Sequence, residues 1–356
     1  MGGFEATDTW GVLFLALVGT AFLFYILALL VLRSRASPLV LVVAAAAVIQ
    51  LTPLAGPLLL SRDVYSYWAY GRIVALHDRN PFVVPPIHFA HDPATRAAAW
   101  RRQTPVYGPA FTLATGAVAE AAQRSSEVAS FLFRFAAAVG GLAAAALAAL
   151  IARRKAFAFA FLGWNPLVAL SFAGGGHNDA WMVVVLLLSA LALVARRRDV
   201  AGGAVWLLAA AVKAPALALL LLQRSRRGFW LGAAAAAVVV AAASTAIFGG
   251  AWLSAGAQLS GREASFGLPA RLESLGLPGL AAHGLALAVL VVGAVYLARR
   301  RPSLSLGASL LVFTSPWVLP WYATWPVALA AVEEDVAAQV VAVGLALYLL
   351  PDRVTL

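Results

Sequence analysis

The sequence predicts an all-α protein integrated in a membrane, and two observations support this fold class. Hydrophobic residues make up 63% of the 356 residues and charged residues only 12%, a balance too apolar for a soluble domain. Apolar runs long enough to cross a bilayer recur to the end of the chain, beginning with 13–32 and 39–60. We therefore expect a single polytopic domain over residues 1–356, with roughly 11–12 transmembrane or half-membrane helices.

Basic residues gather in five short connectors between the apolar runs. Fourteen of the 26 lysines and arginines lie in these connectors, at positions 33 and 35, 153–155, 196–198, 224–227 and 299–301. The positive-inside rule places such connectors in the cytoplasm, and this topology also explains the net charge of +11 without a nucleic-acid partner. We expect a multi-pass plasma-membrane protein whose first and second external loops, 61–106 and 249–277, and whose 315–322 turn share the extracytoplasmic side.

Two of the apolar segments are expected not to span the membrane. The run 201–222 has arginine clusters at both ends, so we predict a helical hairpin with its apex at Val212-Lys213-Ala214-Pro215. Pro215 interrupts the helical hydrogen bonds there, and about ten residues of helix rise only about 15 Å, which is half the membrane. The segment 106–122 is also short and is predicted to be a juxtamembrane or partial helix.

The first external loop opens with an aspartate among aromatic residues. A helix over 62–72 would place Asp63 and Tyr67 on one face and would form an amphipathic juxtamembrane helix at the interface. On this side of the membrane, the carboxylates close to the apolar runs are chiefly Asp63 and Asp179, which makes Asp63 the first candidate for chemistry. The alternative is an aromatic interfacial anchor, in which Asp63 serves only as a helix cap or as the salt-bridge partner of Arg62.

A second group of polar residues follows a glycine turn at 174–176. His177, Asn178 and Asp179 stand directly before the next apolar run, and glycines let a backbone approach a ligand closely. These three residues are candidates for binding a sugar or a phosphate. The alternative is that Asn178 or Asp179 is simply the N-cap of the next helix.

Lys213 lies within an apolar run, about ten residues from either end. A cation at this depth costs several kcal/mol unless it is paired or hydrated, so a functional role is the default expectation, with an anionic phosphate as a suitable partner. The alternative is a lysine that snorkels to the surface. A methionine at this position is expected to be tolerated, because it suits the membrane interior better than an unpaired charge.

Aromatic residues and prolines gather near the end of the chain, in Ser315-Pro316-Trp317 to Pro320-Trp321-Tyr322. Such a turn offers aromatic faces for stacking on a sugar, and a plain interfacial aromatic belt is the alternative. The histidines of the first loop lack metal-ligand spacing, so we expect neither a metal nor another cofactor, with a lone divalent ion on Asp63 and Asp179 as the alternative. The chain has no cysteine.

These residues favour sugar transfer over hydrolysis. Glycosidases need two carboxylates, one of which protonates a poor leaving group, whereas a lipid phosphate leaves without an acid when cations hold it. One carboxylate then suffices as the general base. The rival class is a transporter or flippase for lipid-linked sugars, which also uses broken helices, but the chain shows no internal repeat.

The motifs of this chain resemble those of the polyprenol-phosphate-mannose-dependent α-1,6-mannosyltransferases, members of the C-type superfamily of multi-spanning membrane glycosyltransferases. The motifs that carry this resemblance, in order, are Asp63-Val-Tyr-Ser-Tyr, Tyr70-Gly-Arg72, Asn80-Pro81-Phe82, Thr104-Pro-Val-Tyr107-Gly108-Pro109, Gly175-Gly176-His177-Asn178-Asp179-Ala180, Val212-Lys213-Ala-Pro215 and Ser315-Pro316-Trp317 with Pro320-Trp321-Tyr322. The resemblance implies an extracytoplasmic site, a polyprenyl-phosphate sugar donor, inversion at the anomeric carbon, and a catalytic aspartate that maps onto Asp63.

Together, the residues and the resemblance assign a role to each candidate. We expect Asp63 to be the general base, and Lys213, Arg72 and Arg62 to hold the donor phosphate. The substrates are a polyprenyl-phosphate monosaccharide, with mannose as the expected sugar, and a glycan or glycolipid acceptor. The residues expected to bind the sugar and the acceptor are His177, Asn178, Asp179, Tyr67, Tyr107, Trp317, Trp321 and Tyr322.

Overall fold

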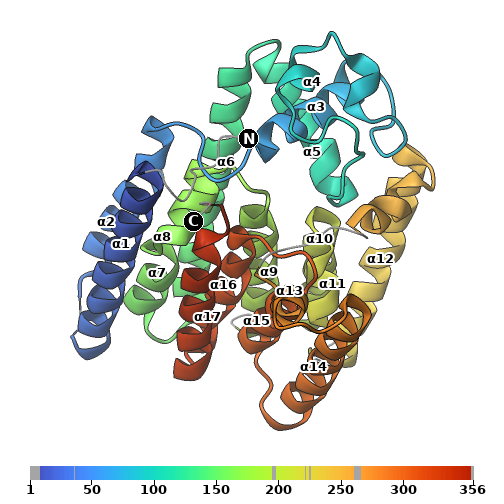
Figure 1. Cartoon of the computed structure of the whole chain (residues 1–356). Helices are drawn as coiled ribbons and strands as arrows, with labels where there is room; N and C mark the ends of the chain where they lie inside the picture. Colours follow the sequence, from blue (N-terminus) through green and yellow to red (C-terminus); the bar gives the residue numbers. More distant parts are fainter. Residues whose placement is uncertain are drawn as a thin grey trace.

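The computed structural model describes residues 9–35, 37–194, 198–220, 222–223, 226–259 and 266–353, and every regular element in these ranges is a helix (Figure 1). The arginines predicted to be cytoplasmic at 196, 197 and 224, and residues 260–265 of the predicted second external loop, lie outside these ranges. The α-helices are α1 Thr9–Ser34, α2 Leu39–Leu51, α3 Asp63–Ala75, α4 Pro93–Ala97, α5 Pro109–Ala122, α6 Ser126–Ile151, α7 Lys155–Gly163, α8 Pro166–Ala169, α9 Asp179–Val194, α10 Asp199–Val212, α11 Pro215–Leu220, α12 Arg227–Phe248, α13 Leu268–Ser274, α14 Gly279–Arg300, α15 Leu304–Thr314, α16 Thr324–Glu333 and α17 Val336–Leu349.

The predicted all-helical membrane class is confirmed. Within the described ranges, α1, α6, α12 and α14 are long and apolar enough to cross a membrane. A fifth candidate span is formed by α7 with the segment Pro166–Gly174, which are bent by 52° at the break between them. Five shorter apolar helices of 10–17 residues accompany them, so the chain is a multi-pass membrane protein that combines full spans with shorter segments.

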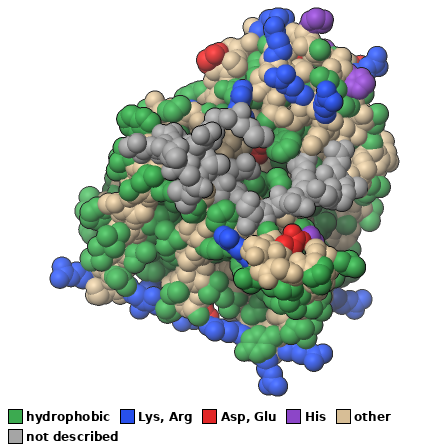
Figure 2. All heavy atoms as spheres, in the orientation of Figure 1, with side chains coloured by type: hydrophobic (Ala, Val, Ile, Leu, Met, Phe, Trp, Pro, Cys, Tyr) green, Lys and Arg blue, Asp and Glu red, His purple; other side chains and the backbone are tan. Residues whose placement is uncertain are grey.

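Charged side chains concentrate at the two ends of the molecule. Figure 2 shows lysines and arginines along the lower edge and a second charged group at the upper end. The side chains between them are mainly hydrophobic, apart from a small charged group near the centre of the view. In Figure 1 the connectors α1–α2, α6–α7 and α14–α15 lie at the lower end, whereas α3, α4 and α5 form a cap at the upper end. The described arginines of these connectors are exposed. The basic connectors and the motif-rich first loop therefore lie at opposite ends.

The predicted helical hairpin is confirmed. α10 ends at Val212, Lys213 has an extended backbone with φ −153°, and α11 begins two residues later. The Trp206 indole donates a hydrogen bond to the Ala216 carbonyl at 2.9 Å, although ten residues separate them. The start of α12 also packs on the start of α10, where a Cβ added to Gly232 would lie 1.9 Å from a backbone oxygen of α10. The chain thus returns to the end at which α10 began.

The helix predicted at the start of the first loop forms, but not as an interfacial anchor. α3 begins at Asp63 and lies in the cap together with α5. Its side chains from Val64 to Ile73 are nearly all buried in the protein. Gly71 allows α5 to approach so closely that an added Cβ would lie 2.2 Å from the Thr115 oxygen. The interpretation as an anchor was wrong because α4, α5 and α6 cover the aromatic side chains.

Candidate active site

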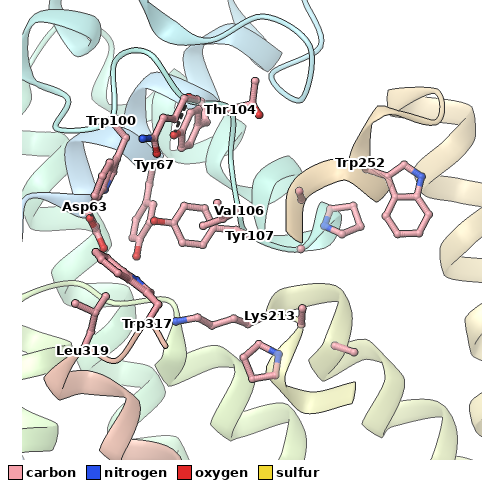
Figure 3. Close-up of a pocket in the computed structure, with 18 of the residues that line it drawn as sticks. Asp63, Tyr67, Trp100, Thr104, Val106, Tyr107, Lys213, Trp252, Trp317 and Leu319 are labelled. Carbon is pink, nitrogen blue, oxygen red and sulfur yellow. Dashed lines mark hydrogen bonds between the residues drawn. The ribbon is translucent and has the colours of Figure 1, made fainter. Parts of the chain in front are cut away.

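A cavity of about 370 Å³ lies where the cap meets the hairpin apex (Figure 3). Its walls come from α3, the segment 100–109, the hairpin, residues 252–255 after α12, and the 317–322 turn. Asp63 and Lys213 are the charged residues among the described residues that line it. In Figure 3 the Lys213 side chain extends toward the part of the cavity that holds Asp63 and Tyr67, whereas Trp252 lies on the opposite side.

Asp63 presents its carboxylate at the N-terminus of α3. Its backbone N–H donates to Ser61 Oγ at 3.0 Å, and its Oδ1 accepts a hydrogen bond from Trp100 Nε1 at 2.8 Å. A helix N-terminus and an indole N–H both favour a negative charge at this position. Sequence reasoning missed Trp100, because a residue in an irregular loop 37 positions away shows no periodic relation to α3.

Aromatic rings follow Asp63 along one wall of the cavity. Tyr67 lies one helical turn after Asp63, and its ring meets those of Tyr107 and Phe111 edge to face, with centroids 4.9 and 5.0 Å apart. Burial and then the charges of Asp63 and Asp179 raise the pKa of Tyr67 well above its usual value. Its phenol therefore stays protonated and remains a hydrogen-bond donor.

A glycine docks the first loop onto the hairpin. The Gly108 N–H donates to the Val212 carbonyl at 3.0 Å, and a Cβ at this position would lie only 2.0 Å from the Ala211 oxygen. A larger residue would push the segment 104–109 away from the end of α10. This close approach places Tyr107 beside the hairpin apex, and so joins two motifs that are about 100 residues apart in the chain.

Lys213 is held by a buried counter-ion. Its Nζ donates to Asp179 Oδ1 and Oδ2 at 2.7 and 2.8 Å, and the two side chains are 9% and 0% exposed. The Trp325 indole also donates to Asp179 Oδ1, and the ammonium lies 4.5 Å from the centroid of the Tyr322 ring. The alternative of a snorkelling lysine is therefore wrong, and Asp179 acts first as the partner of Lys213.

The glycine turn precedes His177 and Asn178, which are buried and are not among the residues that line the cavity. The His177 ring stacks on Trp321 with centroids 3.7 Å apart and an interplanar angle of 18°, and its Nδ1 lies 3.9 Å from Asp63 Oδ2. Asn178 is 1% exposed, and neither polar atom of its side chain has a hydrogen-bond partner among the described residues. The capping alternative therefore fails for Asn178.

Two predicted phosphate ligands do not reach the cavity. Arg62 is exposed, and its guanidinium donates to the Ala97 carbonyl at 3.3 Å. Arg72 is buried and donates to both Asp92 oxygens at 2.8 and 2.9 Å. Nine helical positions separate Arg72 from Asp63, which is a rise of about 13.5 Å along α3. In contrast, five of the residues expected to bind the sugar and the acceptor line the cavity: Tyr67, Tyr107, Trp317, Trp321 and Tyr322. Their role as ligands stays a prediction.

These features define the class of protein: a multi-pass membrane protein whose internal, aromatic-walled cavity holds a carboxylate and a paired lysine. A comparison with family models identifies the family. Residues 5–224 match the family described as alpha-(1->6)-mannopyranosyltransferase, N-terminal domain. The match spans more than half of the 356 residues, so the chain belongs to this family of mannosyltransferases, as its motifs suggested. No curated protein and no solved structure matched the chain.

Proposed function

We propose that the protein transfers mannose from a polyprenyl-phosphate mannose to a hydroxyl group of a glycan or glycolipid. The observation that carries this proposal is that one cavity holds both Asp63 and Lys213, and both residues lie within the matched family region. Family membership favours an enzyme over the transporter alternative. The rest of the cavity wall is mainly apolar and aromatic, which suits a sugar attached to a lipid.

Asp63 acts as the general base on the acceptor. The acceptor O–H bond breaks and its proton passes to the carboxylate, while the oxygen forms a bond to the anomeric carbon of mannose. The bond from that carbon to the phosphate oxygen breaks on the opposite face, and its electron pair leaves with the phosphate, so the configuration inverts. No second carboxylate is required as an acid, and Asp179 is already occupied by Lys213.

Lys213 holds the donor phosphate. An ammonium group has three N–H donors, so pairing with Asp179 does not exhaust its capacity for hydrogen bonds. The apolar surroundings strengthen a charge-assisted bond to a phosphate oxygen. Leu217 and Leu253, which also line the cavity, provide the apolar contacts that an isoprenoid chain requires.

The sugar and the acceptor lie among the aromatic side chains of the cavity wall. Asn178 is buried and does not line the cavity, so it takes no part in this proposal. The faces and edges available for stacking come from Tyr67, Tyr107, Trp317, Trp321 and Tyr322. Arg62 and Arg72 take no part in this proposal, because neither lines the cavity.

The active site faces the extracytoplasmic side of the plasma membrane, because the basic connectors lie at the opposite end. The chain has no native cysteine, so single cysteines report sidedness directly. Two exposed positions serve for this test: His91 in the first loop, replaced in His91→Cys, and Ser34 at the end of α1, replaced in Ser34→Cys. In intact cells an impermeant maleimide should label the former and not the latter, and the reverse pattern would contradict this orientation.

The donor is tested with purified protein in nanodiscs. Polyprenyl-phosphate mannose, glucose and arabinose are offered together with a mannan or glycolipid acceptor, and a nucleotide-linked mannose serves as the control donor. We expect transfer from polyprenyl-phosphate mannose only. Transfer from the nucleotide donor, or movement of the intact lipid-linked sugar across the membrane without transfer, would refute the proposal.

A further inference from the structure

The carboxylate of Asp63 is approached from two sides by segments distant in the chain. Trp100 Nε1 donates to Oδ1 at 2.8 Å from the first loop, and His177 Nδ1 faces Oδ2 at 3.9 Å from the turn before α9. The His177 side chain is 0% exposed, and His177 is not among the residues that line the cavity. It therefore lies behind Asp63 rather than beside a bound sugar.

The local backbone is built to place this ring. A Cβ at Gly175 would lie 2.8 Å from Cδ2 and from Nε2 of the His177 ring. Gly176 has φ +68°, and a Cβ there would lie 2.5 Å from Val64 Cγ1, in the first turn of α3. The two glycines thus allow the turn, the imidazole and the start of α3 to approach one another, which explains the Gly-Gly-His order in physical terms.

Trp321 fixes the plane of the imidazole. The rings are stacked, with centroids 3.7 Å apart, and Trp321 itself is 2% exposed. Rotation of the ring out of this plane would cost the stacking contact. Within this plane, Nδ1 lies 3.9 Å from Asp63 Oδ2.

We propose that His177 is a positioning residue for Asp63 rather than a sugar ligand. Together with Trp100 it restricts the carboxylate to the orientation that faces the cavity and the acceptor hydroxyl. The inference rests on the proposed function, because it assigns a role relative to the base of that reaction. The orientation of a general base strongly affects the reaction rate, since a misplacement of about 1 Å can lower the rate about 10²-fold.

Most of the charges around Asp63 are already compensated. Lys213 and Asp179 form an ion pair, Arg134 donates to the carbonyls of Ala173 and Pro53, and Tyr67 and Tyr107 are buried phenols with raised pKa values. Unlike these groups, the imidazole of His177 is of a type that ordinarily changes charge near neutral pH. A positive charge on His177 would favour the carboxylate form of Asp63, so the acid side of the pH–rate profile reports their contact.

Two variants separate positioning from sugar binding. His177→Phe keeps a ring to stack on Trp321 but has no nitrogen, whereas His177→Asn keeps a polar nitrogen near the Nδ1 position. We expect His177→Phe to lower kcat about 10–100-fold, with both KM values changed less than about three-fold. His177→Asn should recover most of kcat. In both variants, the fall in rate on the acid side of the pH–rate profile should occur at higher pH than in wild type. Unchanged kcat in His177→Phe, or a raised donor KM with kcat retained, would overturn the proposal.

A second measurement does not depend on activity. Thermal unfolding in detergent is compared for wild type, Asp63→Asn, His177→Phe and the double variant. If the two side chains interact, His177→Phe should lower the unfolding midpoint less in the Asp63→Asn background than in wild type. Additive shifts would show that there is no coupling and would overturn the proposal. If the wild-type protein transfers no mannose but the two substitutions still show coupling in thermal unfolding, the proposed function is refuted and the contact between His177 and Asp63 is retained.

Discussion

Replacing Lys213 by methionine should destabilise the protein, because it leaves the Asp179 carboxylate without its counter-ion. Lys213 Nζ donates to both oxygens of Asp179, whose side chain is fully buried. Removing one partner of a buried ion pair costs about 3–5 kcal/mol. With an unfolding entropy of ~2.1 cal/mol/K per residue over 356 residues, this lowers the unfolding midpoint by about 4–7 °C.

The matched control removes both charges. In Lys213→Met combined with Asp179→Asn, the amide oxygen at position 179 still accepts from the Trp325 indole, and no buried charge remains. Thermal unfolding in the same detergent should return to within about 2 °C of wild type. Donor affinity should stay low in the double variant, because the phosphate still lacks the ammonium.

Two outcomes would refute this reasoning. If Lys213→Met unfolds at the wild-type midpoint, the pair with Asp179 is not a stabilising element of the fold. If the double variant is as unstable as the single variant, loss of the lysine acts through packing and not through an unpaired carboxylate. Wild-type donor affinity in a folded double variant would remove Lys213 from the phosphate site.

Other consequences of the structure are open to direct measurement. Gly108→Ala should lower the unfolding midpoint by the equivalent of about 1–3 kcal/mol and should reduce transfer, because its Cβ would lie 2.0 Å from a backbone oxygen of α10. Gly284→Ala, with no atom within 4 Å, is the control and should be neutral or stabilising. Burial raises the pKa of the Asp92 carboxyl, but hydrogen bonds from His77 and Arg72 outweigh it and lower that pKa below 3.8. The stabilisation from Asp92 is therefore fully present above pH 3.8 and is lost as the pH falls through the lowered pKa. Asp92→Asn should therefore reduce the loss of thermal stability at low pH, and an unchanged pH dependence of the unfolding midpoint would contradict the assignment.

The helical class and the hairpin were predictable because their signals are local. Apolar runs and arginine clusters are read directly along the chain, and Pro215 marks the break beside Lys213. The motifs also pointed to most of the cavity residues. Even so, the sequence indicated that a methionine at position 213 would be tolerated, because it does not show that Asp179, 34 positions earlier, supplies a counter-ion.

Contacts between distant segments account for what sequence reasoning could not reach. Trp100 touches Asp63 across 37 positions, and no periodicity links a loop residue to a helix N-terminus. The same reasoning grouped Arg72 with Asp63 because both lie in the helix predicted over 62–72. Residues that are close in the sequence are nevertheless separated along the axis of a helix. Arg72 therefore lies away from Asp63 and pairs with Asp92 instead.

The most direct test of the central claim is the rate of mannose transfer by Asp63→Asn. The amide keeps the shape of the side chain and an oxygen for Trp100, but it cannot take a proton from the acceptor. With radiolabelled polyprenyl-phosphate mannose in nanodiscs, we expect transfer to fall by about 10²-fold or more while donor affinity stays within a few-fold of wild type. A variant that turns over at nearly the wild-type rate would show that Asp63 is not the base.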